Sequence, residues 1–109
     1  MKIFLSALLL AASPVVFAEC SRPPAPEMPD GSVAELQTMV DGQAAVKAYV
    51  AGTEAYLDCL GAEGELAGEE EMPEAKLARV ELHNAAVDEM EAVAEAFNAE
   101  IREYKAKAQ

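Results

Sequence analysis

Apolar side chains recur at alternating intervals of three and four residues through the C-terminal part of the chain, and glutamates fill many of the positions between them. This spacing places the apolar residues along one face of a helix, as in a coiled coil. Pro73 suits the first turn, where a missing amide hydrogen does no harm, and Lys105 and Lys107 suit the negative end of the helix dipole. The pattern predicts a helix over about residues 73–107. Its seam comprises Val80, His83, Val87, Met90, Ala94, Phe97, Ile101 and Tyr104.

The same spacing earlier in the chain predicts another helix over about residues 32–60. The segment from Ser32 to Glu35 fits a capping box at its start, and Gly61 supplies the left-handed residue that commonly ends a helix. Gly42 and Gly52 lie beside the seam and leave thin surfaces that another backbone can approach closely. The seam comprises Leu36, Met39, Gln43, Val46, Val50, Thr53, Leu57 and Leu60.

The two predicted helices are joined by residues 61–72, a glycine-rich acidic segment that is typical of an exposed loop. Helices of similar length with a short connection fold back as an antiparallel hairpin, so the predicted class is all-α, without strands. Pairing that is symmetric about this loop places Thr53 opposite Val80 and Leu36 opposite Phe97. Apolar residues off the seam indicate that the chain either dimerises to a four-helix bundle or covers this surface with its own N-terminal segment. Examples are Val40, Leu82 and Val93.

The first eighteen residues have the pattern of a signal peptide. Lys2 is followed by a short apolar run, Pro14 breaks it, and a small-residue cleavage site ends at Ala18. The run is too short to span a bilayer core of about 30 Å, so no membrane anchor is expected after cleavage. Lipid attachment at Cys20 is disfavoured because Glu19 stands where a small residue is required. The predicted location is the periplasm or the exterior.

Residues 19–31 form a proline-rich segment with Pro23, Pro24, Pro26 and Pro29. Closely spaced prolines favour an extended polyproline-II-like strap, which the turn-forming sequence from Pro29 to Gly31 closes. A ligand for a proline-recognising domain is the less common alternative.

The two cysteines, Cys20 and Cys59, are expected to form a disulfide, as is usual in an exported chain. A helix from Ser32 to Cys59 rises about 40 Å, and an extended chain from Cys20 to Ser32 reaches about 37–43 Å. An intramolecular bond therefore requires the strap to run antiparallel along the whole helix, unless the helix bends at a glycine. This bond is favoured, while an intermolecular bond that holds a dimer stays open.

Charge excludes several classes of partner. The full sequence has 20 acidic and 8 basic side chains and a net charge of −12, which becomes about −13 once Lys2 is removed with the signal. Nucleic acid and anionic membranes would repel such a chain. The expected partner is a protein or a second copy.

A group of polar residues lies in or beside the two seams. His83 interrupts the seam of the second helix and Asn84 follows it, while Tyr49, Thr53 and Tyr56 lie on the first helix. They are interpreted as a polar layer in the hairpin core that fixes the register. The alternative is a ligand site, in which the chain carries a small molecule or a metal on His83.

No motif in the sequence indicates catalysis. Glu81 precedes His83 by two residues rather than three, which does not fit a di-iron site. No nucleophile has a base at a recognisable spacing, and no glycine-rich phosphate loop is present. The sequence predicts no enzyme, no catalytic residue, no cofactor and no metal site.

The order of these signals resembles that of a family of uncharacterised small exported helical-hairpin proteins of Gram-negative bacteria. The resemblance implies a disulfide-linked hairpin without a known activity. Together with the residue patterns, it leads to the expectation of a non-enzymatic interaction or scaffold protein. The residues that carry it are Cys20-Ser21-Arg22-Pro23, Pro29-Asp30-Gly31, Tyr56-Leu57-Asp58-Cys59-Leu60, His83-Asn84 and Phe97-Asn98.

Overall fold

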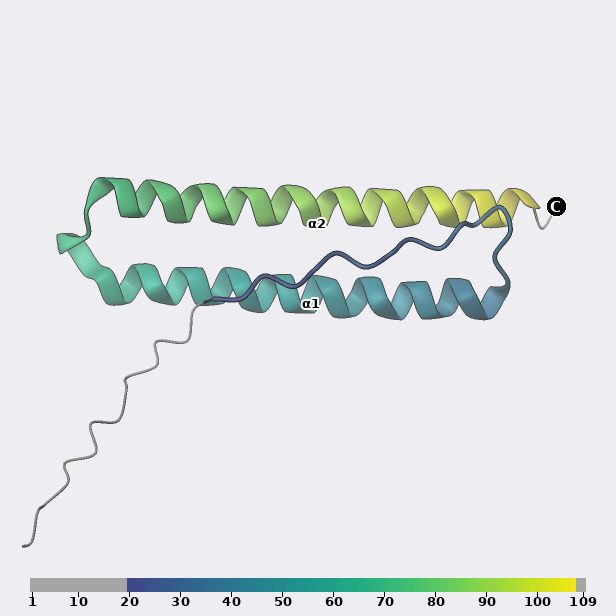
Figure 1. Ribbon diagram of the computed structural model, residues 1–109, viewed down its shortest axis with the longest axis horizontal. Coiled ribbons are helices and arrows are strands. Elements are labelled where there is room, and N and C mark those ends of the chain that lie inside the picture. The colour runs from purple at the N-terminus through teal and green to yellow at the C-terminus, as the bar shows by residue number, and fades with distance from the viewer. Residues whose placement is uncertain (1–19, 108–109) are drawn as a thin grey trace, which may run out of the picture.

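The computed structural model describes residues 20–107, which form a hairpin of two long helices with an extended strap lying across them (Figure 1). Helix α1 spans Leu36–Ala67, a short 3-10 helix η1 spans Gly68–Glu70, and helix α2 spans Pro73–Lys107. The all-α hairpin expected from the two seams is confirmed. The predicted signal peptide, residues 1–18, lies outside the described residues.

Helix α1 begins at Leu36, later than predicted, because Ser32 is engaged elsewhere. The Ser32 amide and hydroxyl both donate to Asp30 Oδ1, at 3.0 and 2.6 Å. These bonds lower the pKa of Asp30. The residue that precedes the helix is Glu35, which makes no side-chain capping bond. The predicted capping box is therefore wrong. Ser32 forms hydrogen bonds with the nearby carboxylate of Asp30 and does not cap the helix.

The other end of α1 also differs from the prediction, because the helix continues through Gly61 to Ala67. Gly68, with a φ of 64°, is the left-handed residue that ends it. A glycine inside a helix costs only about 1 kcal/mol, so Gly61 does not have to end the helix. Gly64 has a packing role there, since a Cβ on it would lie 2.9 Å from Nε of Arg79.

The longer α1 changes which residues face each other across the hairpin. Gly42, not Leu36, is level with Phe97, and Leu36 lines a hollow that extends from Phe97 to Ile101 and Tyr104. The true turn is centred near residue 70, so the opposed positions are displaced by about seven residues, or one heptad. The predicted pairings are therefore wrong.

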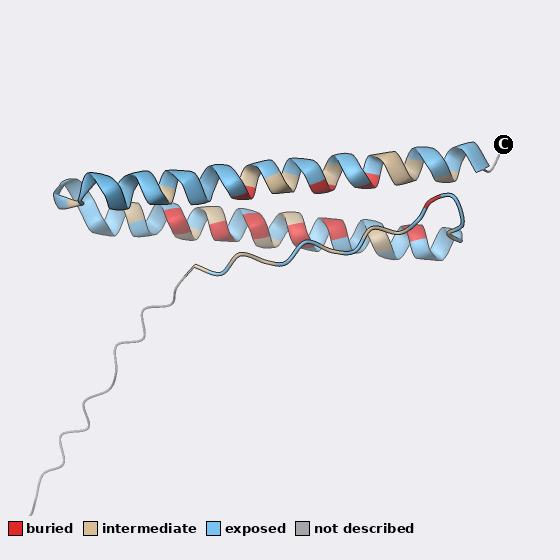
Figure 2. Ribbon diagram, turned by 45° about the horizontal axis from the view of Figure 1, so that its top comes forward, coloured by how far each residue is buried: buried red, intermediate tan, exposed pale blue. Residues whose placement is uncertain are grey.

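The core lies along the inner faces of the helices and beneath the strap (Figure 2). Met28 of the strap packs against its larger cluster and Cys20 against its smaller one. The strap thus forms a third layer on one side of the groove between α1 and α2. The larger cluster comprises Met39, Val46, Tyr49, Val93 and Phe97, and the smaller one Tyr56, Leu60 and Ala86.

Three glycines allow the strap to approach the helices closely. A Cβ on Gly42 would lie 3.0 Å from Pro29, and one on Gly52 would lie 3.2 Å from Pro23. A Cβ on Gly31 would lie 1.9 Å from the carbonyl oxygen of Glu100. The Gly31 amide also donates to Glu100 Oε2 at 2.7 Å. The small residues beside the first seam therefore receive the strap of the same chain.

Replacing Gly31 by alanine is expected to lower the free energy of unfolding by about 2–3 kcal/mol, because the new methyl group would collide with the α2 backbone. Gly61→Ala is the matched control, since nothing lies within 4 Å of its Cβ position. This variant should gain up to about 1 kcal/mol from better helix propensity. Urea denaturation measures both. Equal effects of the two substitutions would contradict the close approach at Gly31.

The ion pair that closes the loop gives a pH dependence. Arg79 donates two hydrogen bonds to the Glu71 carboxylate, and these bonds lower the pKa of Glu71. A lowered folded-state pKa gives stability that is present above the unfolded-state value of about 4.3 and is lost as the pH falls through the folded-state value. Glu71→Gln should therefore reduce stability at pH 7 and flatten the loss in acid, as measured by thermal unfolding across pH 2–7. The exposed neighbour Glu70, changed to Gln, should leave the wild-type profile unchanged.

Candidate functional site

The strap is fixed to the hairpin by a disulfide between Cys20 and Cys59, whose Cα atoms are 5.6 Å apart. The bond is intramolecular, and the strap runs antiparallel to α1 between the start of that helix and Cys59 (Figure 1). This is the arrangement that the matched lengths of strap and helix required. The intermolecular alternative does not occur in this structure.

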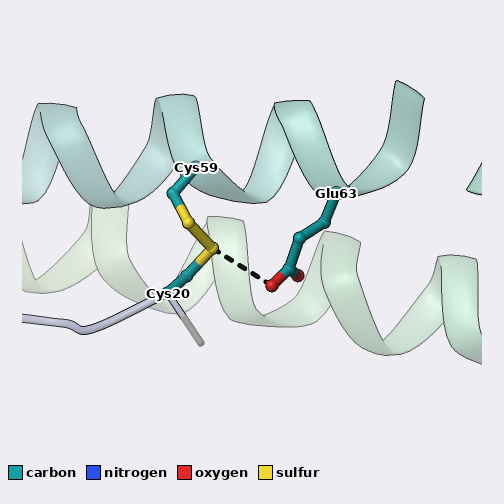
Figure 3. A group of neighbouring side chains, drawn as sticks. All are labelled: Cys20, Cys59 and Glu63. Carbon is teal, nitrogen blue, oxygen red and sulfur yellow. Dashed lines mark hydrogen bonds between the residues drawn. A yellow bond between two sulfur atoms is a disulfide. The ribbon is translucent and has the colours of Figure 1, made fainter. Parts of the chain in front are cut away.

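Glu63 lies beside the disulfide, with Oε1 3.2 Å from Sγ of Cys20 (Figure 3). A disulfide sulfur carries no proton, so this contact becomes a hydrogen bond only when Cys20 is a thiol. In the described part of the chain, these three residues are the one group spaced closely enough to hold a metal ion. Both sulfurs are consumed by the disulfide, and the oxidised protein therefore offers no thiolate ligand there.

A second tie joins all three layers near the Cys20 end of the strap. Arg22 forms an ion pair with Glu89 of α2 and donates to the carbonyl oxygen of Ala85 at 3.2 Å. Tyr49 of α1 donates to Glu89 Oε1 at 3.3 Å. Glu89 thus accepts hydrogen bonds from the strap and from α1 at once. Arg22 and Glu89 keep about a third of their side-chain surface exposed, so the tie contributes more to orientation than to stability.

The predicted polar layer is only partly assembled. Tyr49 and Tyr56 are buried and Thr53 is fully buried, but His83 and Asn84 are exposed. The prediction of a buried layer is wrong for these last two residues. The buried residues of α2 are Ala86, Val93 and Phe97, and His83 lies exposed at the edge of the hairpin. The structure does not bring the five residues together.

Burial of Tyr49 affects the pKa of its phenol. It raises the pKa of Tyr49, and the neighbouring Glu89 carboxylate adds to the rise, so the phenol remains a hydrogen-bond donor at neutral pH. The Thr53 hydroxyl lies close to this phenol, yet it meets hydrogen-bond geometry with no described residue. Both groups serve the packing of α1, and neither faces a cavity.

The side of the hairpin away from the strap is uncovered, and we call it the open groove. It contains a hollow of about 290 Å³ near the loop and another of about 170 Å³ near the open end. No strap residue lines either one. The first is lined by Leu57, Leu60, Gly61, Arg79, Val80 and His83, and the second by Leu36, Met39, Val40, Gln43, Phe97, Ile101 and Tyr104.

Large apolar side chains are exposed along the open groove. Leu36 keeps 63% of its surface accessible, Val40 47% and Val80 46%. Leu36 and Val80 belong to the predicted seams, which were assigned to the hairpin interior. Val40 was predicted to lie off the seam, on a surface that a second copy or the N-terminal segment would cover. The tie between Arg22 and Glu89 was missed. The one feature of the sequence that could have indicated this tie is the presence of an arginine, Arg22, within the proline-rich strap.

None of the helices described in residues 20–107 has the length and apolar character needed to cross a membrane. A comparison with protein-family models, with curated proteins and with solved structures finds no match for this chain.

Reduction of the disulfide is expected to release the strap and to lower the free energy of unfolding by about 4 kcal/mol, the chain-entropy value for a loop of this length. Urea denaturation with and without a thiol reductant measures the change. The variant with both Cys20→Ser and Cys59→Ser should match the reduced protein and should not respond to reductant. Equal midpoints for the oxidised and reduced wild type would contradict a clamping role.

Proposed function

We propose that this protein is a non-enzymatic interaction module of the bacterial envelope, exported to the periplasm or beyond, that binds another protein through its open groove. The observation that carries this proposal is the exposure of Leu36, Val40 and Val80, which line or border the two hollows on the side of the hairpin away from the strap. Contiguous apolar surface bordered by polar residues is typical of protein–protein interaction sites.

Two further features support the proposal. An intramolecular disulfide is stable in an oxidising compartment such as the periplasm, and it holds the strap on the opposite side of the hairpin from the groove. The chain also has an acidic excess of twelve charges, which keeps it soluble while an apolar face remains open. The strap thus occupies one side of the hairpin and leaves the other for a partner.

The hollow that His83 lines favours a second candidate, a carrier of a small molecule. Its apolar walls are accompanied by the side chains of His83 and Arg79, which suit an amphipathic anion better than a metal ion. Among the described residues, His83 belongs to no group of three metal-ligating side chains. The hollow is shallow and open, and the interaction role explains more of the exposed surface.

In-cell photo-crosslinking tests the proposal. A benzophenone side chain placed at Val40 or at Val80 should give the same adduct, because both positions border the open groove. Leu82 is the matched control: it is 49% exposed and stands two residues from Val80, yet it lines neither hollow. The Leu82 probe should give no such adduct. Mass spectrometry of the adducts identifies the partner.

Three results would count against the interaction role. They are the absence of any adduct from Val40 and Val80, different adducts from these two positions, or the same adduct from Leu82. Fractionation of the cells and N-terminal sequencing of the protein test the location in the same samples. Recovery of the uncleaved chain from the cytoplasm would contradict export.

A further inference from the structure

The open groove is formed by one stripe on each helix. Its members are spaced by seven residues, which keeps them on one face, and they lie between or beside the two hollows. Such a pair of stripes is the surface that a second helical hairpin covers in a four-helix bundle. The stripe of α1 comprises Leu36, Gln43, Val50 and Leu57, and that of α2 comprises Val80, Val87, Ala94 and Ile101.

The rim of the open groove differs from the rest of the molecule in charge. We define the rim as the exposed residues that follow each stripe position by four, on the side away from the core. It has two lysines and two glutamates and is therefore neutral, whereas the whole chain has 20 acidic and 8 basic side chains. The rim residues are Val40, Lys47, Glu54 and Gly61 on α1, and Asn84, Glu91, Asn98 and Lys105 on α2.

A neutral rim identifies the chemistry of the partner. A basic partner would be matched by an acidic rim, and this chain has many glutamates that could have supplied one. The rim instead suits a surface that carries both signs and a matching apolar stripe. A second copy of the chain presents such a surface, and a two-fold axis makes it self-complementary.

We infer that the open groove is a homodimer interface, in which two hairpins pack face to face with their straps on the outside. This inference rests on the proposed function and names the partner of the same groove. A two-fold axis parallel to the helices places α1 of each copy on α2 of the other at the same height. Within one copy Gly42 is level with Phe97, so Lys47 is level with position 92. Lys47 therefore meets Glu91 of the second copy.

The same arrangement brings no like charges together at the rim. Glu54 comes level with the region of Asn84 of the second copy, and Val40 with that of Asn98. In an alternative arrangement α1 stacks antiparallel on α1, with Lys47 level with Glu54. This arrangement places the two Glu91 residues only about 7.5 Å apart along the helix axis. Charge therefore favours the arrangement with the parallel axis.

Sedimentation equilibrium of the purified oxidised protein tests the dimer. The wild type is expected to be dimeric at micromolar concentrations. Val80→Glu places a charge in the groove and should raise the dissociation constant at least about tenfold. The matched control Leu82→Glu adds the same charge at similar exposure outside the groove, so its dissociation constant should stay within about twofold of the wild type. Circular dichroism and disulfide mapping confirm that each variant folds.

Charge reversal tests the orientation. Lys47→Glu and Glu91→Lys should each weaken the dimer about tenfold, and the double variant should recover to within about threefold of the wild type. Glu91→Lys makes the chain less acidic, so its weakening cannot come from overall repulsion. A double variant no stronger than the single ones would overturn the parallel-axis arrangement.

The dimer and the proposed function fail in distinguishable ways. A wild type that stays monomeric at several hundred micromolar, or equal effects of Val80→Glu and Leu82→Glu, overturns the dimer. If crosslinks from Val40 and Val80 then yield one other protein, the interaction role stands with a different partner. Adducts with twice the mass of the chain support the dimer.

Discussion

The match in length between the strap and α1 is the constraint from which the arrangement of the molecule follows. The Cys20–Cys59 bond closes only if the strap is nearly extended, and the prolines hold it in that conformation. A strap fixed in this way must lie along the helices throughout its length. It therefore needs small residues at its close contacts, which are Gly42 and Gly52 on α1 beneath it and Gly31 at its own end against α2. The disulfide, the prolines and these glycines together hold the strap along the helices.

The position of the strap also determines which faces of the helices are buried. A bare hairpin would bury one seam on each helix. The strap adds contacts on one side, so Ala86 and Val93 become buried while Val80 and His83 move to the edge. The apolar stripe on the far side is left without a cover of its own. The chain thus has one groove that it fills itself and one that it leaves open.

The sequence predicted the two helices, the hairpin and the course of the strap, because these depend on patterns that repeat over many residues. It failed where one local interaction decides the outcome. Asp30 accepts the hydrogen bonds that Ser32 was expected to use as a cap, and Gly61 was taken to end a helix that continues to Ala67. The second error moved every predicted pairing by about one heptad. A heptad seam specifies which face of a helix is buried but not its axial register against the other helix, so the pattern could not reveal the error.

The same property of heptad seams bears on the role of the open groove. Since a seam repeats, apolar stripes alone allow a second hairpin to bind at several heights, and charged positions must select one of them. The rim contains both charged and uncharged positions, and its charged residues are Lys47 and Glu54 on α1 and Glu91 and Lys105 on α2. A shift by one heptad would place Lys47 beside Asn84 or Asn98 of a second copy and would lose its partner Glu91. The charged rim residues can therefore select the axial register of a second copy, which the apolar stripe alone does not determine.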